Sequence, residues 1–159
     1  MIRSTIAADV VDLLALAQAT GLFETPEVEV LGQLLAEHFE AGGESADLWL
    51  TDDGEEGVGP VGVAYVSPEK MTDRTWNLLL LAVHPDRQKR GRGAALLRHV
   101  ERELAERGGR LLLVETAGVD EFAYVRAFYR KHGLEQDAVI RDFYADGVDK
   151  VVFRKALVG

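Results

Sequence analysis

One apolar run constrains the fold of this 159-residue chain more than any other feature of its sequence. Residues 78–83 read Leu-Leu-Leu-Leu-Ala-Val, so no position of the run offers a polar side chain to solvent. A short run that is apolar at every position is typical of a strand buried on both faces, since a half-exposed strand alternates apolar and polar residues. The run therefore predicts an interior strand of an α/β sheet.

Helices and strands alternate around this run. Amphipathic spacing predicts four helices, each followed by glycine, over residues 7–20, 26–39, 94–107 and 121–132. Strands are expected over residues 1–5, 48–51, 61–67, 76–83, 111–116, 139–144 and 151–155, and Asp146-Gly147 has the composition of a hairpin turn between the last two. The polar stretch 52–60 is interpreted as a turn between strands. The order βααβββαβαββ predicts a single α/β domain over residues 1–159 with a mixed sheet.

Composition excludes several classes of function. Eighteen basic residues against twenty-seven acidic ones give a net charge of −9, which argues against a nucleic-acid partner. The absence of cysteine rules out disulfides and a thiol nucleophile, and the four histidines do not share metal-ligand spacing, so no metal is expected. No apolar stretch reaches about 18 residues and the N-terminus does not resemble a signal peptide. We therefore expect a soluble, cytoplasmic protein that does not bind a membrane.

The most informative segment joins the apolar strand to the helix predicted over 94–107. Gly91 and Gly93 allow the backbone to approach a ligand closely, and the first N–H groups of a helix have no internal acceptor. Such a place binds anions. Four cations and one acid between residues 86 and 93 give a local charge of +3, which opposes the helix dipole and favours a bound polyanion. The alternative is a basic, glycine-rich connection without a ligand.

Two familiar phosphate loops do not fit this segment. A Rossmann fingerprint needs a third glycine where Leu96 stands, and it follows the first strand of its fold. A P-loop needs Gly-Lys-Ser/Thr, whereas Gly91 is followed by Arg92 and Gly93.

Three features in order resemble the GCN5-related N-acetyltransferase (GNAT) family. Residues 88–93 read Gln-Lys-Arg-Gly-Arg-Gly, which is similar to that family's Gln/Arg-x-x-Gly-x-Gly/Ala signature. The buried strand before it and Phe-Tyr-Arg-Lys-His-Gly-Leu over 128–134 also resemble family elements, especially of ribosomal-protein N-terminal acetyltransferases. The resemblance covers nearly the whole chain. It implies a mostly antiparallel sheet of six or seven strands with about four helices.

The resemblance also implies acetyl-CoA as co-substrate. In such proteins the loop holds the cofactor pyrophosphate, which here corresponds to Gln88, Lys89, Arg90, Gly91, Arg92, Gly93 and Ala94. The backbone of the preceding strand pairs with the pantetheine arm, here at Leu81, Ala82 and Val83. Lys89, Arg90 or Arg92 can reach the 3′-phosphate, and Asp120 or Phe122 stands where relatives carry a cofactor-contacting asparagine.

Acid and base candidates follow from the need to deprotonate an amine and protonate a leaving thiolate. Glu115 follows the apolar run 111–114 at the strand end where α/β sheets bind ligands, and the resemblance implies a glutamate base there, direct or through water. The alternative is a solvated or structural glutamate. The resemblance makes Tyr129 the general acid, whereas its helical spacing with Phe122 and Val125 is equally that of a core residue.

The acceptor is expected to be a primary amine, on a small molecule or a protein, attacked directly in a ternary complex. Phe143 and Tyr144 resemble an aromatic pair that holds a substrate backbone in peptide acetyltransferases, although strand packing also favours aromatics. A homodimer is a possible assembly, because this fold has an exposed edge strand. The competing hypothesis is a non-catalytic acyl-CoA-binding regulatory module on the same fold.

Overall fold

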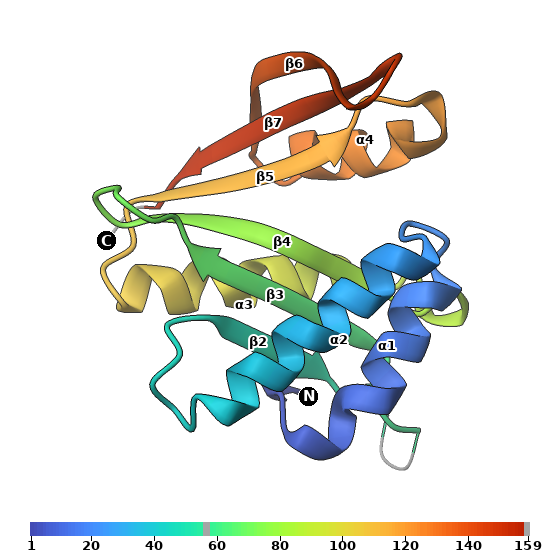
Figure 1. Cartoon of the computed structure of the whole chain (residues 1–159), viewed down its shortest axis with the longest axis vertical. Coiled ribbons are helices and arrows are strands. Elements are labelled where there is room, and N and C mark those ends of the chain that lie inside the picture. The colour runs from blue at the N-terminus through green and yellow to red at the C-terminus, as the bar shows by residue number, and fades with distance from the viewer. Residues whose placement is uncertain (56–57, 158–159) are drawn as a thin grey trace. The chain divides into compact units, whose positions relative to one another are not determined.

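The computed structural model describes residues 1–55 and 58–157, and these form two compact units (Figure 1). The first unit comprises Met1–Ser67 and Leu80–Val100, and the second comprises Pro68–Leu79 and the chain from Glu101 onward. Two strands and one helix therefore contribute residues to both units.

The helices and strands follow the predicted order. They are β1 (Ile2–Ser4), α1 (Val10–Ala19), α2 (Thr25–Glu40), β2 (Leu48–Asp52), β3 (Gly62–Pro68), β4 (Thr75–Val83), α3 (Arg92–Glu106), β5 (Leu111–Ala117), α4 (Ala123–Lys131), β6 (Glu135–Ala145) and β7 (Val148–Ala156). Short 3-10 turns precede α1, α3 and α4. Glu56 and Gly57 of the predicted polar turn lie outside the described residues.

The sheet has seven strands in the order β1-β2-β3-β4-β5-β7-β6. Its β1–β2, β2–β3, β5–β7 and β6–β7 pairs are antiparallel, whereas β4 and β5 are parallel. The predicted mixed, mostly antiparallel sheet with four α-helices is thus confirmed. Strand β1 lies at one edge, as predicted, and β6 lies at the other.

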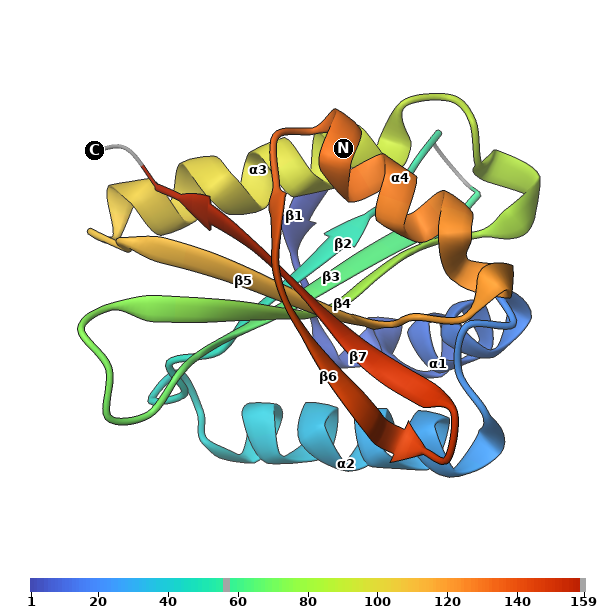
Figure 2. The same ribbon diagram turned by 90° about the horizontal axis from the view of Figure 1, so that it is seen from above.

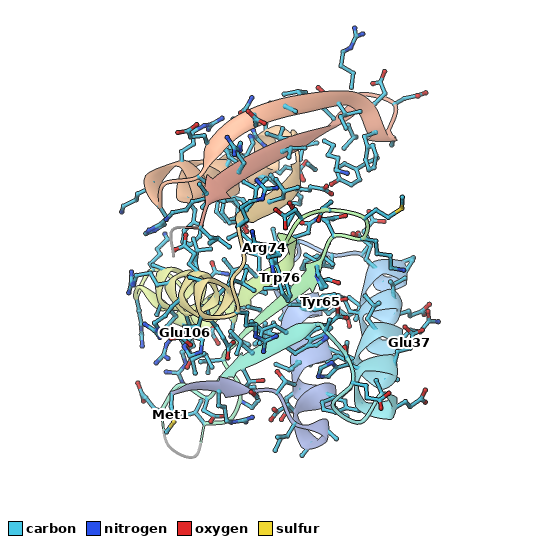
Figure 3. All side chains as sticks on the ribbon, turned by 90° about the vertical axis from the view of Figure 1, so that its left-hand side faces the viewer. Met1, Glu37, Tyr65, Arg74, Trp76 and Glu106 are labelled. Atoms are coloured by element: carbon cyan, nitrogen blue, oxygen red, sulfur yellow. The ribbon has the colours of Figure 1, made fainter. Side chains whose placement is uncertain are left out.

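In the first unit, α1 and α2 cover one face of the sheet (Figure 1). Their apolar residues pack against inward-facing side chains of β2, β3 and β4, and the Trp49 and Tyr65 rings stack there with centroids 4.0 Å apart. Figure 3 shows Tyr65 pointing from β3 toward this helical layer and Glu37 pointing away from α2. The predicted apolar stripes of both helices therefore form the core on this side.

The first turns of α3 pack closely on β3. A Cβ atom placed on Gly62 would lie 2.9 Å from Cδ1 of Leu96, which is closer than van der Waals contact allows. Gly62 therefore sets how near this part of α3 approaches the strand, and with it the position of the loop before α3.

In the second unit, α4 packs on the β5–β7 pair, and β6 and β7 form the C-terminal hairpin (Figure 2). The Tyr129 ring of α4 lies 5.9 Å from the Phe153 ring of β7, centroid to centroid. The hairpin closes through the predicted Asp146-Gly147 turn, since Ala145 pairs with Val148.

The prediction that the apolar run is buried on both faces is wrong at one residue. Leu79 is 45% exposed and Leu81 is half-buried, whereas Leu78, Leu80 and Ala82 are buried. Leu79 directly follows Leu78, the last residue of β4 that pairs with β5. The composition of a run reports how apolar a strand is, but which of its sides is covered depends on its neighbours.

None of the helices in the described ranges is long and apolar enough to cross a membrane.

Candidate active site

The loop between β4 and α3 is built by its own side chains and lies in the first unit. His84 begins a 3-10 turn over Pro85–Arg87, and its Nδ1 accepts a hydrogen bond from the N–H of Asp86 at 3.2 Å. The side-chain amide of Gln88 donates to the carbonyl of Val83 at 2.9 Å, which ties the end of this turn back to the strand. The predicted cofactor residue Gln88 thus shapes the loop through its side chain.

Two residues of the loop have left-handed backbone. Lys89 has φ +64° and Gly91 has φ +77°. A non-glycine residue in this region is uncommon, and such residues cluster at ligand clamps. Gly91 has no heavy atom within 4 Å of the place a Cβ would take, so the space beside its backbone is open.

The open space lies at the N-terminus of α3. The N–H of Ala95 donates to the carbonyl of Gly91 at 2.9 Å, which is the first hydrogen bond of the helix. By helix geometry, the N–H groups of residues 91–94 precede this bond and lack an intrahelical acceptor. Together with the positive end of the helix dipole, these N–H groups provide the donors that favour an anion at this place.

The cations of the loop are only partly free. Arg92 pairs with Asp52 of β2 at 3.2 Å, and Arg87 lies 4.0 Å from Glu55. Among the residues described, Lys89 and Arg90 have no carboxylate at ion-pair distance, and both are exposed. The fold therefore neutralises part of the +3 charge that the sequence left unbalanced, and Lys89 and Arg90 are better placed than Arg92 to meet a further phosphate.

A cavity of about 450 Å³ adjoins the loop within the first unit. Arg90, Gly91 and Arg92 line it from the loop, Ala95 and His99 from α3, and Asp52 from β2, together with the first residues of the chain. The cavity continues the anion site along the first two turns of α3, so a ligand larger than one phosphate has room there.

The strand segment before the loop supplies backbone rather than side chains. Ala82 and Val83 are buried and Leu81 is half-buried. The Val83 carbonyl is already taken by Gln88, and the N–H of His84 donates to the carbonyl of Val61 at 2.8 Å. These two bonds hold the end of the strand against the loop and against Val61, and pairing of Leu81, Ala82 and Val83 with a ligand stays a prediction.

In the second unit, β5 continues beyond its pairing with β4. The β4–β5 register runs from Thr75 opposite Leu111 to Leu78 opposite Val114. Residues 115–117 stay paired with β7 on the other side. The described ladder thus leaves the β4-facing edge of β5 without a strand partner from Glu115 to Ala117. Apart from the Ala117 carbonyl, which accepts from Arg126, this open edge is a place for a ligand to add hydrogen bonds.

Glu115 stands at the start of this open edge. Its Oε2 atom lies 2.8 Å from Nζ of Lys150, and the two side chains are 26% and 12% exposed. Lys150 comes from β7, where it pairs with Ala117, so the ion pair runs diagonally across the two strands. Lys150 thus holds one carboxylate oxygen, and in the described part of the chain Oε1 has no ion-pair partner.

Tyr129 lies on the opposite face of β5 from Glu115. Val114 pairs with Phe153, whose ring contacts Tyr129, and successive side chains of a strand point to opposite faces. Tyr129 is 6% exposed, and burial raises the pKa of its hydroxyl well above the usual value. The ring therefore packs in the core, as the helical spacing predicts, and the role of general acid stays a prediction.

The remaining candidates lie at the surface of the second unit. Asp120 is exposed in the 3-10 turn before α4, and Arg126 holds this connection by donating to the carbonyls of Ala117 and Val119 at 2.9 and 2.8 Å. Phe143 and Tyr144 are about half exposed on β6, with ring centroids 5.0 Å apart. No group of three histidine, cysteine or acidic side chains in the described ranges is arranged to hold a metal ion.

Two partners of the candidate residues escaped the sequence analysis. Asp52 is the last residue of β2, forty residues before Arg92, and Lys150 lies in the hairpin thirty-five residues after Glu115. Nothing local marks either residue, because both ion pairs depend on strand neighbours.

Comparison with known proteins places these features in a family. The model of the acetyltransferase (GNAT) domain matches residues 44–136, which is more than half of the chain. No curated protein sequence matches significantly. A protein from Desulfovibrio desulfuricans assigned to the GNAT family of acetyltransferases is 31% identical, with a TM-score of 0.94 over 99% of both chains.

Two more distant structures share the fold. One is the ribosomal-protein-S18-alanine N-acetyltransferase from Escherichia coli, which is 22% identical with a TM-score of 0.73 over 100% of this chain and 94% of that one. The other, a protein from Salmonella typhimurium assigned as an acetyltransferase and solved with its cofactor acetyl-CoA, is 17% identical with a TM-score of 0.77 over 100% and 94%. The domain match and the Desulfovibrio similarity show that this chain belongs to the GNAT family of acetyltransferases.

Proposed function

We propose that the protein transfers an acetyl group from acetyl-CoA to a primary amine by direct attack in a ternary complex. The observation that carries the proposal is the loop before α3, where left-handed Lys89 and Gly91 leave the N–H groups of residues 91–94 without intrahelical acceptors. This cradle fits a pyrophosphate, and the adjoining cavity of about 450 Å³ has room for more of the cofactor. Acetyl-CoA supplies the acetyl group as a reactive thioester.

Each candidate residue then has one task. The N–H groups of residues 91–94 bind phosphate oxygens, and exposed Lys89 and Arg90 are available to the 3′-phosphate. Glu115 takes the proton of the attacking amine through its unpaired Oε1, and Tyr129 gives its proton to the departing thiolate. Because these two side chains belong to opposite faces of β5, we place the reacting carbonyl at the open edge of the strand, with the amine on the Glu115 face.

The first experiment is calorimetric titration with acetyl-CoA and with CoA that lacks its 3′-phosphate. We expect acetyl-CoA to bind and the dephosphorylated cofactor to bind about 10-fold more weakly, the loss of one charge-assisted hydrogen bond. Absence of binding to folded protein would overturn the proposal.

Transfer is then measured as CoA release in the presence of four amines of different class. These probes are a peptide with a free N-terminal alanine, an N-blocked lysine peptide, spermidine and an aminoglycoside. Binding of acetyl-CoA without transfer to any of them would favour the non-catalytic acyl-CoA-binding module.

Replacement of Tyr129 by Phe tests the acid. We expect kcat to fall by about 100-fold, the lower end of general-acid contributions, because the raised pKa of the buried hydroxyl makes it a weak acid. Affinity for acetyl-CoA stays unchanged, since the ring and its contact with Phe153 remain. The matched control is Tyr124→Phe on the exposed side of the same helix, which leaves kcat unchanged. Equal kcat in Tyr129→Phe and wild type removes Tyr129 from the mechanism.

A further inference from the structure

Lys150 has an environment that neither strand packing nor solvation explains. Its Nζ lies 2.8 Å from Glu115 and 3.9 Å from the centroid of the Phe143 ring, with the side chain only 12% exposed. A lysine is rarely buried to this extent unless its charge is paired. Here the ammonium is held on one side by a carboxylate and on the other by an aromatic face.

The hairpin is distorted at the point where Phe143 contacts Lys150. Between Ile140, which pairs with Lys150, and Ala145, which pairs with Val148, strand β6 carries four residues opposite one residue of β7. Bulges re-aim side chains, and they are frequent beside active sites. Phe143 is one of the four bulged residues, and it covers the Lys150 ammonium.

Backbone and side chains fix the bulge in place. Asp142 has φ +55°, and its N–H donates to Oδ1 of Asp149 at 3.0 Å. The N–H of Gly147 in turn donates to Oδ1 of Asp142 at 2.8 Å. Two carboxylates thus organise the hairpin tip around an unusual backbone conformation, so the placement of Phe143 over Lys150 is built into the fold.

The ion pair also has a defined consequence for Glu115. Lys150 shares a face of the sheet with Glu115, because Glu115 pairs with Val152, two residues further along β7. Because Oε2 is held by Lys150, rotation of the carboxylate is restricted, and Oε1 is the oxygen presented to a substrate. A glutamate without this partner would sample several rotamers at the end of its strand.

We propose that Lys150, clamped by Phe143, is the positioning residue of the active site and holds the Glu115 carboxylate in the orientation that accepts the amine proton. The inference rests on the proposed role of Glu115. It moves Phe143 from holding the substrate backbone to holding the lysine.

The test compares Lys150→Met with Lys150→Arg. Methionine keeps the unbranched stem and removes the charge, whereas arginine keeps a cation that can pair with a carboxylate and stack on a ring. We expect Lys150→Met to lower kcat by about 10- to 100-fold, the cost of a misplaced catalytic group, with the KM for acetyl-CoA unchanged. Lys150→Arg restores most of the kcat.

The reaction is followed as CoA release from acetyl-CoA. The acetyl group goes to an accepting amine of the panel or, where no amine accepts it, to water. The matched control is Lys155→Met on the same strand, where Lys155 pairs with Glu101 at 2.7 Å. This variant also loses a lysine–glutamate pair of β7, and its kcat stays at the wild-type level. Thermal unfolding of both variants separates loss of fold from loss of positioning.

A double-mutant cycle with Glu115→Gln decides whether Lys150 acts through Glu115. We expect Lys150→Met to have no further effect on kcat when Glu115 is already glutamine, because coupled residues are non-additive. A full additional loss in that background, or wild-type kcat in Lys150→Met alone, overturns the inference. Wild-type kcat in Glu115→Gln instead overturns the proposed base itself, so the two failures are distinguishable.

Phe143→Leu separates the two roles of the ring. If the ring clamps Lys150, its removal lowers kcat by about 2- to 5-fold, which corresponds to the loss of a cation–π contact whose ring is half exposed. A rise in the KM for the amine without a change in kcat would return Phe143 to the substrate and contradict this part of the inference.

Discussion

Substitution of Gly91 by aspartate is expected to weaken acetyl-CoA binding by at least about 100-fold. The new carboxylate would lie among the N–H groups that hold phosphate, and like charges in contact cost several kcal/mol. Gly91 also has φ +77°, which side chains of L-residues rarely adopt, so the loop itself would shift. Calorimetric titration with acetyl-CoA measures the effect directly.

Two variants separate charge from backbone strain. Gly42 has φ +59° and open space around its Cβ position, but it lies after α2, so Gly42→Asp imposes a similar strain away from the loop and leaves binding unchanged. Gly91→Ala adds strain at the loop without charge, and it is expected to bind more tightly than Gly91→Asp. If Gly91→Asp bound acetyl-CoA as well as wild type, the loop would not be the phosphate site.

Replacement of Glu115 by glutamine is expected to lower kcat by about 10²- to 10⁴-fold, the usual contribution of a general base. Glutamine has the same shape but cannot take the proton of the amine at neutral pH. The dissociation constant for acetyl-CoA is expected to stay the same, because the phosphate loop does not involve Glu115. Steady-state CoA release and calorimetry give the two quantities.

Loss of the ion pair needs its own control. Glu115→Gln leaves the Lys150 ammonium without a carboxylate, at a cost of about 1.5–3 kcal/mol of unfolding free energy. Glu101→Gln breaks the comparable pair with Lys155 and is expected to retain wild-type kcat. If both variants lose activity to the same extent, the effect of Glu115→Gln is structural and Glu115 is not the base.

The order of helices and strands followed from local sequence alone. Apolar periodicity located all four α-helices and all seven strands, because each amphipathic stripe or apolar run must find a buried face. Glycines marked the helix ends and the hairpin turn, because the backbone conformation that favours glycine there is set by only a few neighbouring residues. The loop before α3 also followed from local sequence, since the N-terminus of a helix is made of neighbouring backbone, and its binding of an anion stays a prediction.

The candidate acid and base were found individually but not in relation to each other. Glu115 was recognised from its place at a strand end and Tyr129 from the family resemblance. That they belong to opposite faces of β5 depends on the pairing of Val114 with Phe153. That pairing joins positions thirty-nine residues apart, and no local pattern encodes it.

Tertiary structure alone decided how the charges are used. The sequence showed a loop of charge +3 and a glutamate at the end of a strand. The neighbouring residues in the sequence did not indicate an ion-pair partner for either. Strand register brings Asp52 to Arg92 and Lys150 to Glu115, so part of the loop charge is neutralised and the candidate base is held by a cation. Local sequence patterns determine the backbone conformation within a turn or a strand, whereas ion pairs between strands exist only after the sheet has formed.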